Sequence, residues 1–322
     1  MAGCIDSRQI VIIKRKMANH SQLTTEEIQQ IASEYGLTVT DFEPFDGGVN
    51  SSFLLHIEQG DDLTLTVFET MSFDAVTRQA RLLDMLAAHK FPTARLLHPA
   101  NGGYTVTHAG KPVMLKTFIR GQVCSGPDEI MLQQMGMAIA RLHQIPVPDY
   151  LPDWFSYGLD KLPRILNQNI DREFESALGQ RIAVLEAAIP SGLPKGLVHG
   201  DLFFDNVLFM EREFRAVIDF EDATRHYFIY DLGMAVTGMC AGGILRLSET
   251  SLALLTGYQQ VRKLEKSELE TLPLFIEYGA LATACWRFWQ YHINAPDVER
   301  AELHLQMVKL AEEVRVMSNG EI

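Results

Sequence analysis

The stretch His199-Gly-Asp-Leu-Phe-Phe-Asp-Asn206, followed by Asp219-Phe-Glu221, is the most informative part of this chain. Short apolar segments near 207–210 and 214–219, joined by a turn, indicate two strands between the two motifs. One aspartate, an asparagine and two further carboxylates therefore lie on two short loops. Asp219 follows an apolar run, so it is expected to project from the end of a buried strand. A carboxylate there is costly unless a cation pairs with it.

These residue types are the ones that phosphoryl transfer from ATP requires. One carboxylate accepts the proton of the attacking hydroxyl, while an amide oxygen and a second carboxylate hold the Mg²⁺ that bridges the phosphates. The spacing H-x-D-L-x-x-x-N is that of the catalytic loop of protein kinases, with Gly200 in place of arginine, and Asp219-Phe220 stands where they have D-F-G. We predict Asp201 as the general base, or as the group that orients the acceptor hydroxyl, and Asn206 and Asp219 as magnesium ligands.

Three further polar residues are predicted to support these loops. Glu221 is placed to assist the metal from the opposite side of the second loop, and His199 is expected to hold the geometry of the catalytic loop through backbone hydrogen bonds. Asp231 either braces that loop or caps the helix that follows it. The alternative for Asp201 and Asp219 is that they only satisfy local backbone amides, as aspartate often does in turns and at helix caps.

The composition is that of a soluble globular protein, with 47% hydrophobic and 21% charged residues. No apolar run has the length needed to span a bilayer, so no membrane partner is expected. The net charge of -13 disfavours nucleic acid, because phosphate backbones are bound by clustered Lys and Arg. Four scattered cysteines without a C-x-x-C pair favour reduced thiols and a cytoplasmic location. No feature of the sequence indicates an oligomeric state.

The chain is divided into an extension and two lobes. Residues 1–23 are predicted to be a flexible N-terminal extension, and Met17 reads as an alternative start, which leaves open whether 1–16 are translated. A helix is expected to begin where Thr24-Thr-Glu-Glu27 can cap it. Residues 24–120 are predicted to form a small β-rich nucleotide-binding lobe, with one helix at 73–89 and strands near 38–45, 51–58, 63–69, 94–98, 104–108 and 112–119.

Residues 121–322 are predicted to form a larger, mainly helical lobe that carries the catalytic loop and the acceptor pocket. Helices are expected at 127–142 and near 171–189, 230–241, 247–262, 266–292 and 297–317. The predicted fold class is therefore α+β, with a bilobal, protein-kinase-like arrangement of a small antiparallel β lobe with one helix and a helical lobe. Because the linker near 119–123 is short, a ligand site is expected where the lobes meet.

The segment Asp46-Gly-Gly-Val-Asn-Ser-Ser52 lies between two predicted strands of the small lobe. Glycines and small polar residues allow backbone amides to approach phosphate oxygens closely. Residues 46–52 are therefore predicted to form a phosphate-binding loop. An ordinary hairpin turn has a similar composition and stays an alternative.

With these motifs, the chain resembles the aminoglycoside phosphotransferase and choline kinase superfamily, whose members are small-molecule kinases with a protein-kinase-like fold. Within it, the chain is most similar to the kinase-like bacterial homoserine kinases. The resemblance covers about 24–292. Besides the two loops it rests on Gly48-Val-Asn-Ser-Ser-Phe53, Leu65-Thr-Val-Phe-Glu69, Gly110-Lys-Pro-Val-Met-Leu-Lys-Thr-Phe-Ile-Arg-Gly121, Met137-Ala-Ile-Ala-Arg-Leu-His143, Tyr230-Asp-Leu-Gly233, Leu255-Thr-Gly-Tyr258 and Arg287-Phe-Trp289.

The resemblance implies ATP and Mg²⁺ as cofactors. It gives Asp201 the role of base, assigns Asn206 and Asp219 to the metal, and places residues 50–52 near the phosphates. It also implies that the backbone from Thr117 to Ile119 meets the adenine.

One feature departs from other kinases of this architecture. These place a lysine in the third strand and pair it with a helix glutamate. Here the strand reads Leu65-Thr-Val67, and the helix has Gln79 and Arg81 with no glutamate nearby. The group that contacts the α- and β-phosphates stays open, because neither Lys111, expected in a turn, nor Lys116, near the lobe connection, is assigned to them.

The acceptor pocket is predicted between about 230 and 292. Tyr258, Trp286, Arg287 and Trp289 are candidates for its wall, and Arg287 beside aromatic side chains would hold a substrate carboxylate. Aromatic residues at helical spacing are also typical of a core, and that alternative stays open.

These features predict an ATP-dependent phosphotransferase that moves the γ-phosphoryl group to a hydroxyl of a small molecule. L-homoserine is the leading acceptor, and choline-, aminoglycoside- and hexosamine-like alcohols stay open. A catalytically silent nucleotide-binding relative is the second hypothesis, motivated by the missing lysine. Protein substrates are disfavoured, because the few residues between Asp219 and Tyr230 leave little room for an activation segment.

Overall fold

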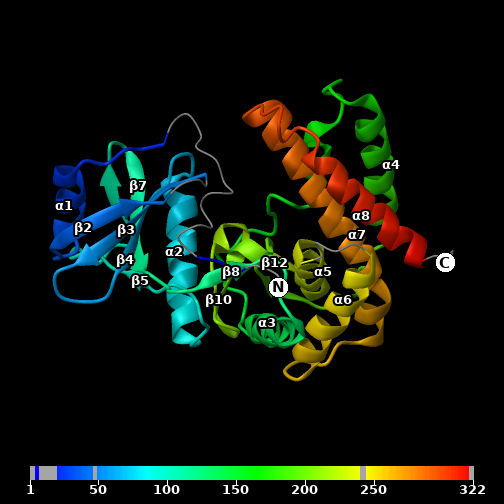
Figure 1. Ribbon diagram of the computed structural model, residues 1–322, viewed down its shortest axis with the longest axis horizontal. Coiled ribbons are helices and arrows are strands. Elements are labelled where there is room, and N and C mark those ends of the chain that lie inside the picture. The colour runs from blue at the N-terminus through cyan, green and yellow to red at the C-terminus, as the bar shows by residue number, and fades with distance from the viewer. Residues whose placement is uncertain (1–3, 7–19, 46–48, 240–243, 319–322) are drawn as a thin grey trace. The chain divides into compact units, whose positions relative to one another are not determined.

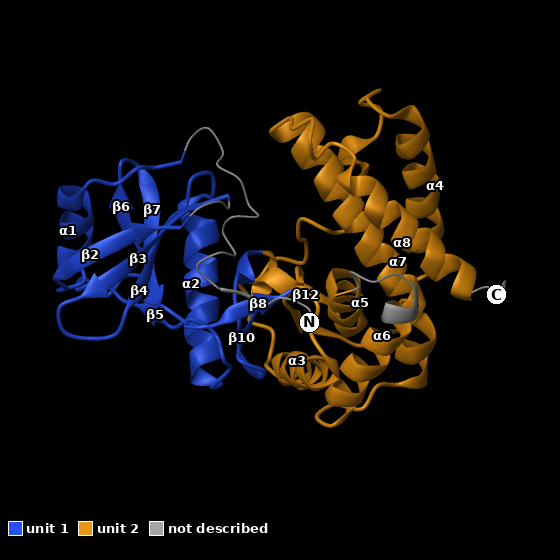
Figure 2. Ribbon diagram, viewed as in Figure 1, with its two compact units in different colours: residues 1, 3–124, 207–221 blue, residues 2, 125–206, 222–322 orange. Residues whose placement is uncertain are grey.

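The computed structural model describes residues 4–6, 20–45, 49–239 and 244–318 (Figure 1). The chain forms two compact units. The first comprises residues 1, 3–124 and 207–221, and the second comprises residues 2, 125–206 and 222–322 (Figure 2). The first unit therefore extends four residues beyond the predicted boundary at 120. It also includes residues 207–221, which had been assigned to the helical lobe.

An antiparallel sheet with the strand order β2-β3-β4-β7-β5 is the base of the first unit, and β6 joins it by pairing with β7. The strands lie within or close to the short segments that were predicted as strands. They are β2 (Val39–Pro44), β3 (Ser51–Ile57), β4 (Leu63–Val67), β5 (Leu96–Leu97), β6 (Val106–His108) and β7 (Lys111–Thr117). Lys111 thus begins a strand, and its prediction as a turn residue is wrong.

One face of this sheet packs into a hydrophobic cluster. The register pairs Phe53 with Leu65 and Leu65 with Leu115, and paired residues project to the same face. These side chains are buried together with Ile28 and Ile31 of α1 (Thr25–Ser33). The residues between them along β4 and β7 project to the opposite face.

Side-chain caps set the beginnings of the two long helices of this unit. Thr24 and Glu27 form a capping box at α1, as predicted from the sequence. Ser72 accepts a hydrogen bond from the Ala75 amide and so begins α2 (Phe73–Ala88), which agrees with the helix predicted at 73–89.

A second sheet in the first unit has the strand order β1-β8-β10-β11. Its members are β1 (Cys4–Asp6), β8 (Gln122–Cys124), β10 (Val207–Met210) and β11 (Glu213–Val217). Because β10 pairs with β8, the hairpin 207–221 belongs to this unit. Within the extension predicted at 1–23, residues 4–6 are a strand, while 1–3 and 7–19 lie outside the described residues.

Helices dominate the second unit: α3 (Glu129–Leu142), α4 (Arg172–Ala188), α5 (Phe228–Met239), α6 (Ile244–Gln259), α7 (Lys266–Phe288) and α8 (Leu303–Ser318). α3 packs against α6, and α7 packs against α5 and α8, which lies beside it in Figure 1. The α3–α6 contact depends on glycine, since a Cβ on Gly136 would overlap the carbonyl oxygen of Leu254.

Three parts of the second unit differ from the prediction. The helix expected at 297–317 begins only at Leu303, as α8. The helix expected at 266–292 is α-helical only to Phe288 and continues as a π-helical segment, η5 (Trp289–Asn294). A short antiparallel pair, β9 (Lys195–Val198) with β12 (Thr224–Tyr227), had not been predicted. The architecture is nevertheless the predicted α+β class, with an antiparallel β lobe and a larger helical lobe. Among the described helices, none has the length and hydropathy required to cross a membrane.

Candidate active site

The catalytic loop follows β9 directly. Leu197 and Val198 are fully buried, and the loop begins where this apolar strand ends, at His199. It closes with a turn of 3-10 helix, η3 (Phe204–Asn206). The loop is therefore held at one end by the β9–β12 pair and at the other by β10, which begins at the next residue.

Asp231 of α5 fixes the first peptide groups of this loop. Its Oδ2 accepts a hydrogen bond from the His199 amide at 2.8 Å, and its Oδ1 accepts one from the Gly200 amide at 3.0 Å. The Asp231 side chain is fully buried, where a carboxylate needs such donors. Of the two roles proposed from the sequence for Asp231, this geometry corresponds to bracing the loop.

His199 makes the next contact inside the loop. The Asp201 amide donates to Nδ1 of His199 at 3.2 Å, so this nitrogen acts as an acceptor. The His199 side chain is fully buried. His199 therefore holds the loop backbone at Asp201 through this hydrogen bond.

Asp201 and Asn206 lie together at the centre of the loop. Nδ2 of Asn206 donates to the Asp201 carbonyl oxygen at 2.8 Å and to Oδ2 of Asp201 at 3.3 Å. The amide nitrogen of Asn206 thus faces Asp201, and its amide oxygen is directed elsewhere. Asp201 remains partly exposed, whereas Asn206 is buried. Such a pair keeps the carboxylate accessible and the amide fixed.

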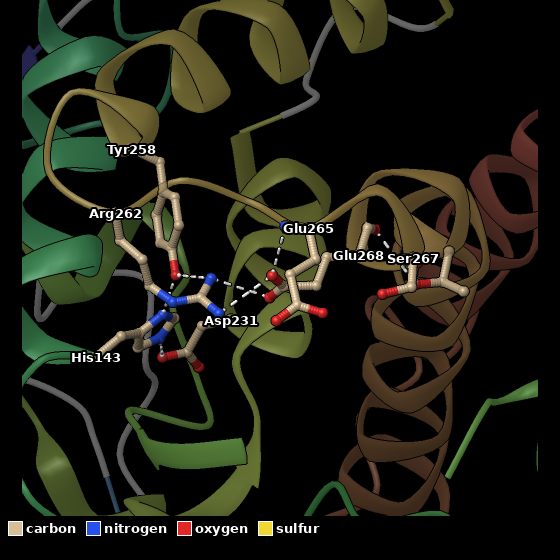
Figure 3. Close-up of polar contacts among 8 residues, drawn as sticks. His143, Asp231, Tyr258, Arg262, Glu265, Ser267 and Glu268 are labelled. Carbon is tan, nitrogen blue, oxygen red and sulfur yellow. Dashed lines mark hydrogen bonds and ion pairs between the residues drawn. The ribbon is translucent and has the colours of Figure 1, made fainter. Parts of the chain in front are cut away.

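A polar network in the core extends from Asp231 away from the catalytic loop (Figure 3). Nε2 of His143 lies 3.1 Å from Oδ2 of Asp231, and Nδ1 of His143 lies 2.8 Å from the Tyr258 hydroxyl. Arg262 donates to that hydroxyl at 3.1 Å and to both carboxylate oxygens of Glu268 at 3.0 and 3.1 Å. The network joins α3, α6 and the first turn of α7 to the loop.

The donor and the acceptor of each hydrogen bond of His143 can be assigned from its partners. An ionised Asp231 only accepts, so Nε2 of His143 donates to it, and Nδ1 then accepts from Tyr258. Burial lowers the pKa of His143, although the bond to Asp231 acts in the opposite direction. The imidazole is therefore neutral at pH 7. The sequence had suggested Tyr258 as a wall of the acceptor pocket, but it is fully buried in this network and does not line an open pocket.

Gly200 has a backbone conformation that other residues adopt at a cost. Its φ is +87°, and a Cβ on it would lie 2.5 Å from the carbonyl oxygen of Asp222. We expect Gly200→Ala to lower the free energy of unfolding by about 2–4 kcal/mol, from the left-handed conformation and the overlap together. Urea denaturation followed by circular dichroism measures this. Gly192→Ala is the matched control, because a Cβ there meets no atom within 4 Å. Equal stability of the two variants would contradict the prediction.

Asp219 lies in the first unit, two residues beyond the end of β11. The amide of Val217 donates to the Pro92 carbonyl oxygen at 3.1 Å, and the buried ring of Phe220 packs edge-on against Phe91. Asp219 itself has a φ of +67°, a left-handed conformation that aspartate tolerates better than most residues. Its position is therefore set from both sides.

The segment predicted to contact phosphates is described only from Val49 onward, and 46–48 lie outside the described residues. Asn50 accepts a hydrogen bond from the Glu69 amide, Ser51 donates to the Glu69 carboxylate, and Ser52 lies 3.3 Å from the Thr66 hydroxyl. Although burial acts to raise it, hydrogen bonds from Lys111 and Ser51 lower the pKa of Glu69 to about 2. Glu69 therefore holds the start of β3, a link that the sequence did not reveal.

The segment predicted to meet the adenine borders a cavity of about 330 Å³ in the first unit. Leu54, Phe118 and Phe209 supply apolar wall, and Asp62 and Arg120 are among its charged residues. The Thr117 and Phe118 amides are used within the unit, by the carbonyl oxygens of Arg95 and Asp62. Thr117 also accepts from the Arg95 amide through its hydroxyl. Within residues 117–119, the Ile119 backbone therefore remains the candidate for contact with the adenine.

Arg287, the predicted carboxylate-binding residue, lies on α7 and contacts α8. Its Nη1 donates to the Leu303 carbonyl oxygen at 3.0 Å and to Oε1 of Gln306 at 3.3 Å. Burial lowers the pKa of Arg287. These contacts link two helices, and a role toward a substrate stays a prediction.

The two predicted metal ligands, Asn206 and Asp219, carry the amide and carboxylate oxygens that Mg²⁺ accepts as ligands. Across the described residues, no group of three or more His, Cys, Asp or Glu side chains could hold a metal by itself. Mg²⁺ commonly uses one or two protein ligands and completes its octahedron with phosphate oxygens and water. One fixed amide, Asn206, and one carboxylate, Asp219, suit that mode.

Comparisons with known proteins identify the family of the chain. Residues 41–264 match the phosphotransferase enzyme family (APH). The chain belongs to this family. A homoserine kinase of Chelativorans sp. (strain BNC1) is 30% identical to this phosphotransferase over 87% of the chain and 90% of the relative. A homoserine kinase of Agrobacterium fabrum is 29% identical over 85% of the chain and 88% of the relative. The predicted resemblance and the prediction of a small-molecule kinase are confirmed.

Solved structures of other small-molecule kinases share the fold of this phosphotransferase. A microcompartment-associated aminopropanol kinase has a TM-score of 0.71 at 20% identity, covering 92% of this chain and 97% of the other. A spectinomycin phosphotransferase in complex with ADP and spectinomycin has a TM-score of 0.69 at 14% identity, covering 92% and 99%. The protein-kinase-like fold is thereby confirmed.

Proposed function

We propose that this phosphotransferase uses ATP and Mg²⁺ to phosphorylate the hydroxyl of L-homoserine. The observation that carries the phosphotransfer is the Asp201–Asn206 pair, held in a loop whose first amides are fixed by a buried carboxylate. The curated relatives named homoserine kinase support the choice of acceptor, because they match most of both chains.

In the proposed reaction, Asp201 orients the acceptor hydroxyl and accepts its proton. The hydroxyl oxygen forms a bond to the γ-phosphorus while the bond from this phosphorus to the bridging oxygen breaks, and ADP leaves. Asn206 and Asp219 would hold the metal, and Glu221 would support it from the same loop. The metal ion, when bound, neutralises the charge that develops on the phosphate oxygens.

The register of the hairpin supports a common role for Asn206 and Asp219. Val207 pairs with Val217, so the residues just outside this pair leave the hairpin at the same end. Asn206 directly precedes Val207, and Asp219 follows Val217 by two residues. A short hairpin is thus a physical reason for one amide and one carboxylate, distant in sequence, to serve one metal.

The nucleoside is placed, in this proposal, beside the chain segment that follows β7. The cavity bordered by Leu54, Phe118 and Phe209 offers the apolar surface that a flat base requires. Ile119 supplies the backbone groups, and residues 50–52 supply contacts to the phosphates. The cavity and these residues all belong to the first unit.

An acceptor panel tests the proposed function. With Mg-ATP, we expect kcat/KM for L-homoserine to exceed that for choline, 1-amino-2-propanol, glucosamine and kanamycin by at least about tenfold, because one buried hydrogen bond or charge pair supplies that discrimination. Release of ADP in a coupled assay measures each rate. Rapid turnover of another alcohol without turnover of homoserine would contradict the acceptor. Nucleotide binding without any turnover would favour the catalytically silent relative.

A further inference from the structure

Kinases of this architecture carry a lysine in the third strand and pair it with a helix glutamate, whereas this chain has neither in β4 and α2. Thr66 stands in β4, the third strand of the sheet, and is buried. Gln79 of α2 is buried as well, and in the described part of the chain its side-chain oxygen has no hydrogen-bond partner. Neither residue supplies a cation for the phosphate chain. A different residue must supply it if the site is to balance the charge of a nucleotide.

Lys116 occupies the neighbouring strand, one residue pair away. In the antiparallel register of β4 and β7, Thr64 pairs with Lys116 and Thr66 pairs with Met114. Paired residues, and residues two apart in one strand, project to the same face of a sheet. Lys116 therefore shares a sheet face with Thr66. This face is opposite to that of Leu65 and Leu115, which pack into the hydrophobic cluster.

Two carboxylates beyond β11 act on the Lys116 ammonium. Burial lowers the pKa of Lys116, whereas Asp219 and Glu221 act to raise it by electrostatic attraction. All three residues belong to the first unit. The lysine ammonium thus lies within electrostatic reach of the residue that the proposed function assigns to the metal.

The neighbouring cations are engaged elsewhere in the same unit. Lys111 pairs with Glu69 and also donates to Ser21. It is an odd-numbered residue of β7, so its side chain leaves the strand on the face opposite to Lys116. Arg120 pairs with Asp62 at 2.9 Å. The carboxylates that balance these two charges, Glu69 and Asp62, are not among the residues proposed to bind the metal.

We propose that Lys116 supplies, from β7, the ammonium that contacts the α- and β-phosphates of the nucleotide in place of the absent third-strand lysine. The proposal rests on the proposed function only in requiring that the protein binds a nucleoside diphosphate. A long, flexible ammonium is a suitable phosphate ligand. Which strand carries the lysine matters less than whether its ammonium reaches the same position beside Asp219.

Binding measurements separate this role from a structural one. Calorimetry with ADP, AMP and adenosine in the presence of Mg²⁺ is carried out on the wild type, on Lys116→Met and on Lys116→Gln. We expect both variants to bind ADP about 10- to 100-fold more weakly, as loss of a charge-assisted hydrogen bond implies, while adenosine binding changes less than about twofold. Lys266→Met removes the same charge from an exposed site on α7 and is expected to retain wild-type affinity for all three ligands.

Three results would overturn the assignment. They are wild-type preference for ADP over adenosine in both Lys116 variants, an equal loss of affinity for ADP and adenosine, or tighter binding of Mg-ADP. The last would mean that Lys116 only neutralises Asp219. A wild-type protein that binds no nucleotide would instead contradict the proposed function. Two replacements of different polarity are used so that a folding defect in one of them does not decide the result.

Discussion

Asp201→Asn is expected to lower kcat by about 10²- to 10⁴-fold, the usual contribution of a general base, and to leave ADP affinity within about twofold of the wild type. The substitution keeps the shape of the side chain and removes only its charge and basicity. Asp201 is partly exposed, so the loop does not depend on its burial. Steady-state rates at saturating Mg-ATP and L-homoserine, together with calorimetry for ADP, measure both quantities.

The control for this change lies in the same loop. Asp205→Asn removes an identical charge from a partly exposed position that has no assigned role. It should retain kcat within about threefold, because nothing in the proposed reaction uses Asp205. If Asp201→Asn kept more than about a tenth of the wild-type kcat, Asp201 would not be the base.

Asp231→Ala is expected to have the largest effect on stability. The carboxylate is fully buried and accepts from the His199 amide, the Gly200 amide and His143. Its removal leaves three buried donors without their acceptor, and because each unsatisfied buried donor costs about 1–3 kcal/mol, we expect a loss of at least about 3 kcal/mol. Urea denaturation followed by circular dichroism measures the free energy of unfolding of the variant and the wild type.

An exposed aspartate in the same unit serves as the comparison. Asp153→Ala is expected to change the free energy of unfolding by no more than about 0.5 kcal/mol, as is usual at the surface. A loss of less than about 1 kcal/mol in Asp231→Ala would show that the loop amides find other acceptors. The bracing role of Asp231 would then be wrong.

Local signals account for the parts of the fold that sequence reasoning predicted. Helix α2 was expected at 73–89 and is found at Phe73–Ala88, because Ser72 caps it and apolar residues follow a helical period. The strands of the first sheet were predicted for a similar reason, since β-rich runs and the turn residues that bound them lie within a few positions of each other. The loop at 199–206 was likewise predicted from the spacing of its own residues.

The missed features depend on contacts between distant residues. β9 and β12 are short and pair across the catalytic loop, and β12 is largely polar, so neither has a period to recognise. His143 contacts an aspartate 88 residues away and a tyrosine 115 residues away. A single histidine at the end of a helix carries no signal of such partners. The prediction of Tyr258 as a pocket residue failed because its partner His143 is distant in the sequence.

Lys116 illustrates a related limit. The sequence offered Lys116 as a cation near the lobe connection but gave no reason to assign it to the phosphates, because register is a property of the folded sheet. Its neighbours Asp219 and Glu221 are about a hundred positions later in the chain. The pairing of β4 with β7 is what places Lys116 on the same sheet face as Thr66.

The path of the chain between the two units limits how this protein can be dissected. Beyond the first three residues, the boundary between units is crossed at 124–125, 206–207 and 221–222. Truncation after Cys124 would delete β10 and β11 and leave β8 without its inner partner. Neither lobe is therefore a separable module, and exchange of nucleotide and acceptor halves among relatives must transplant the hairpin 207–221 with the N-terminal piece.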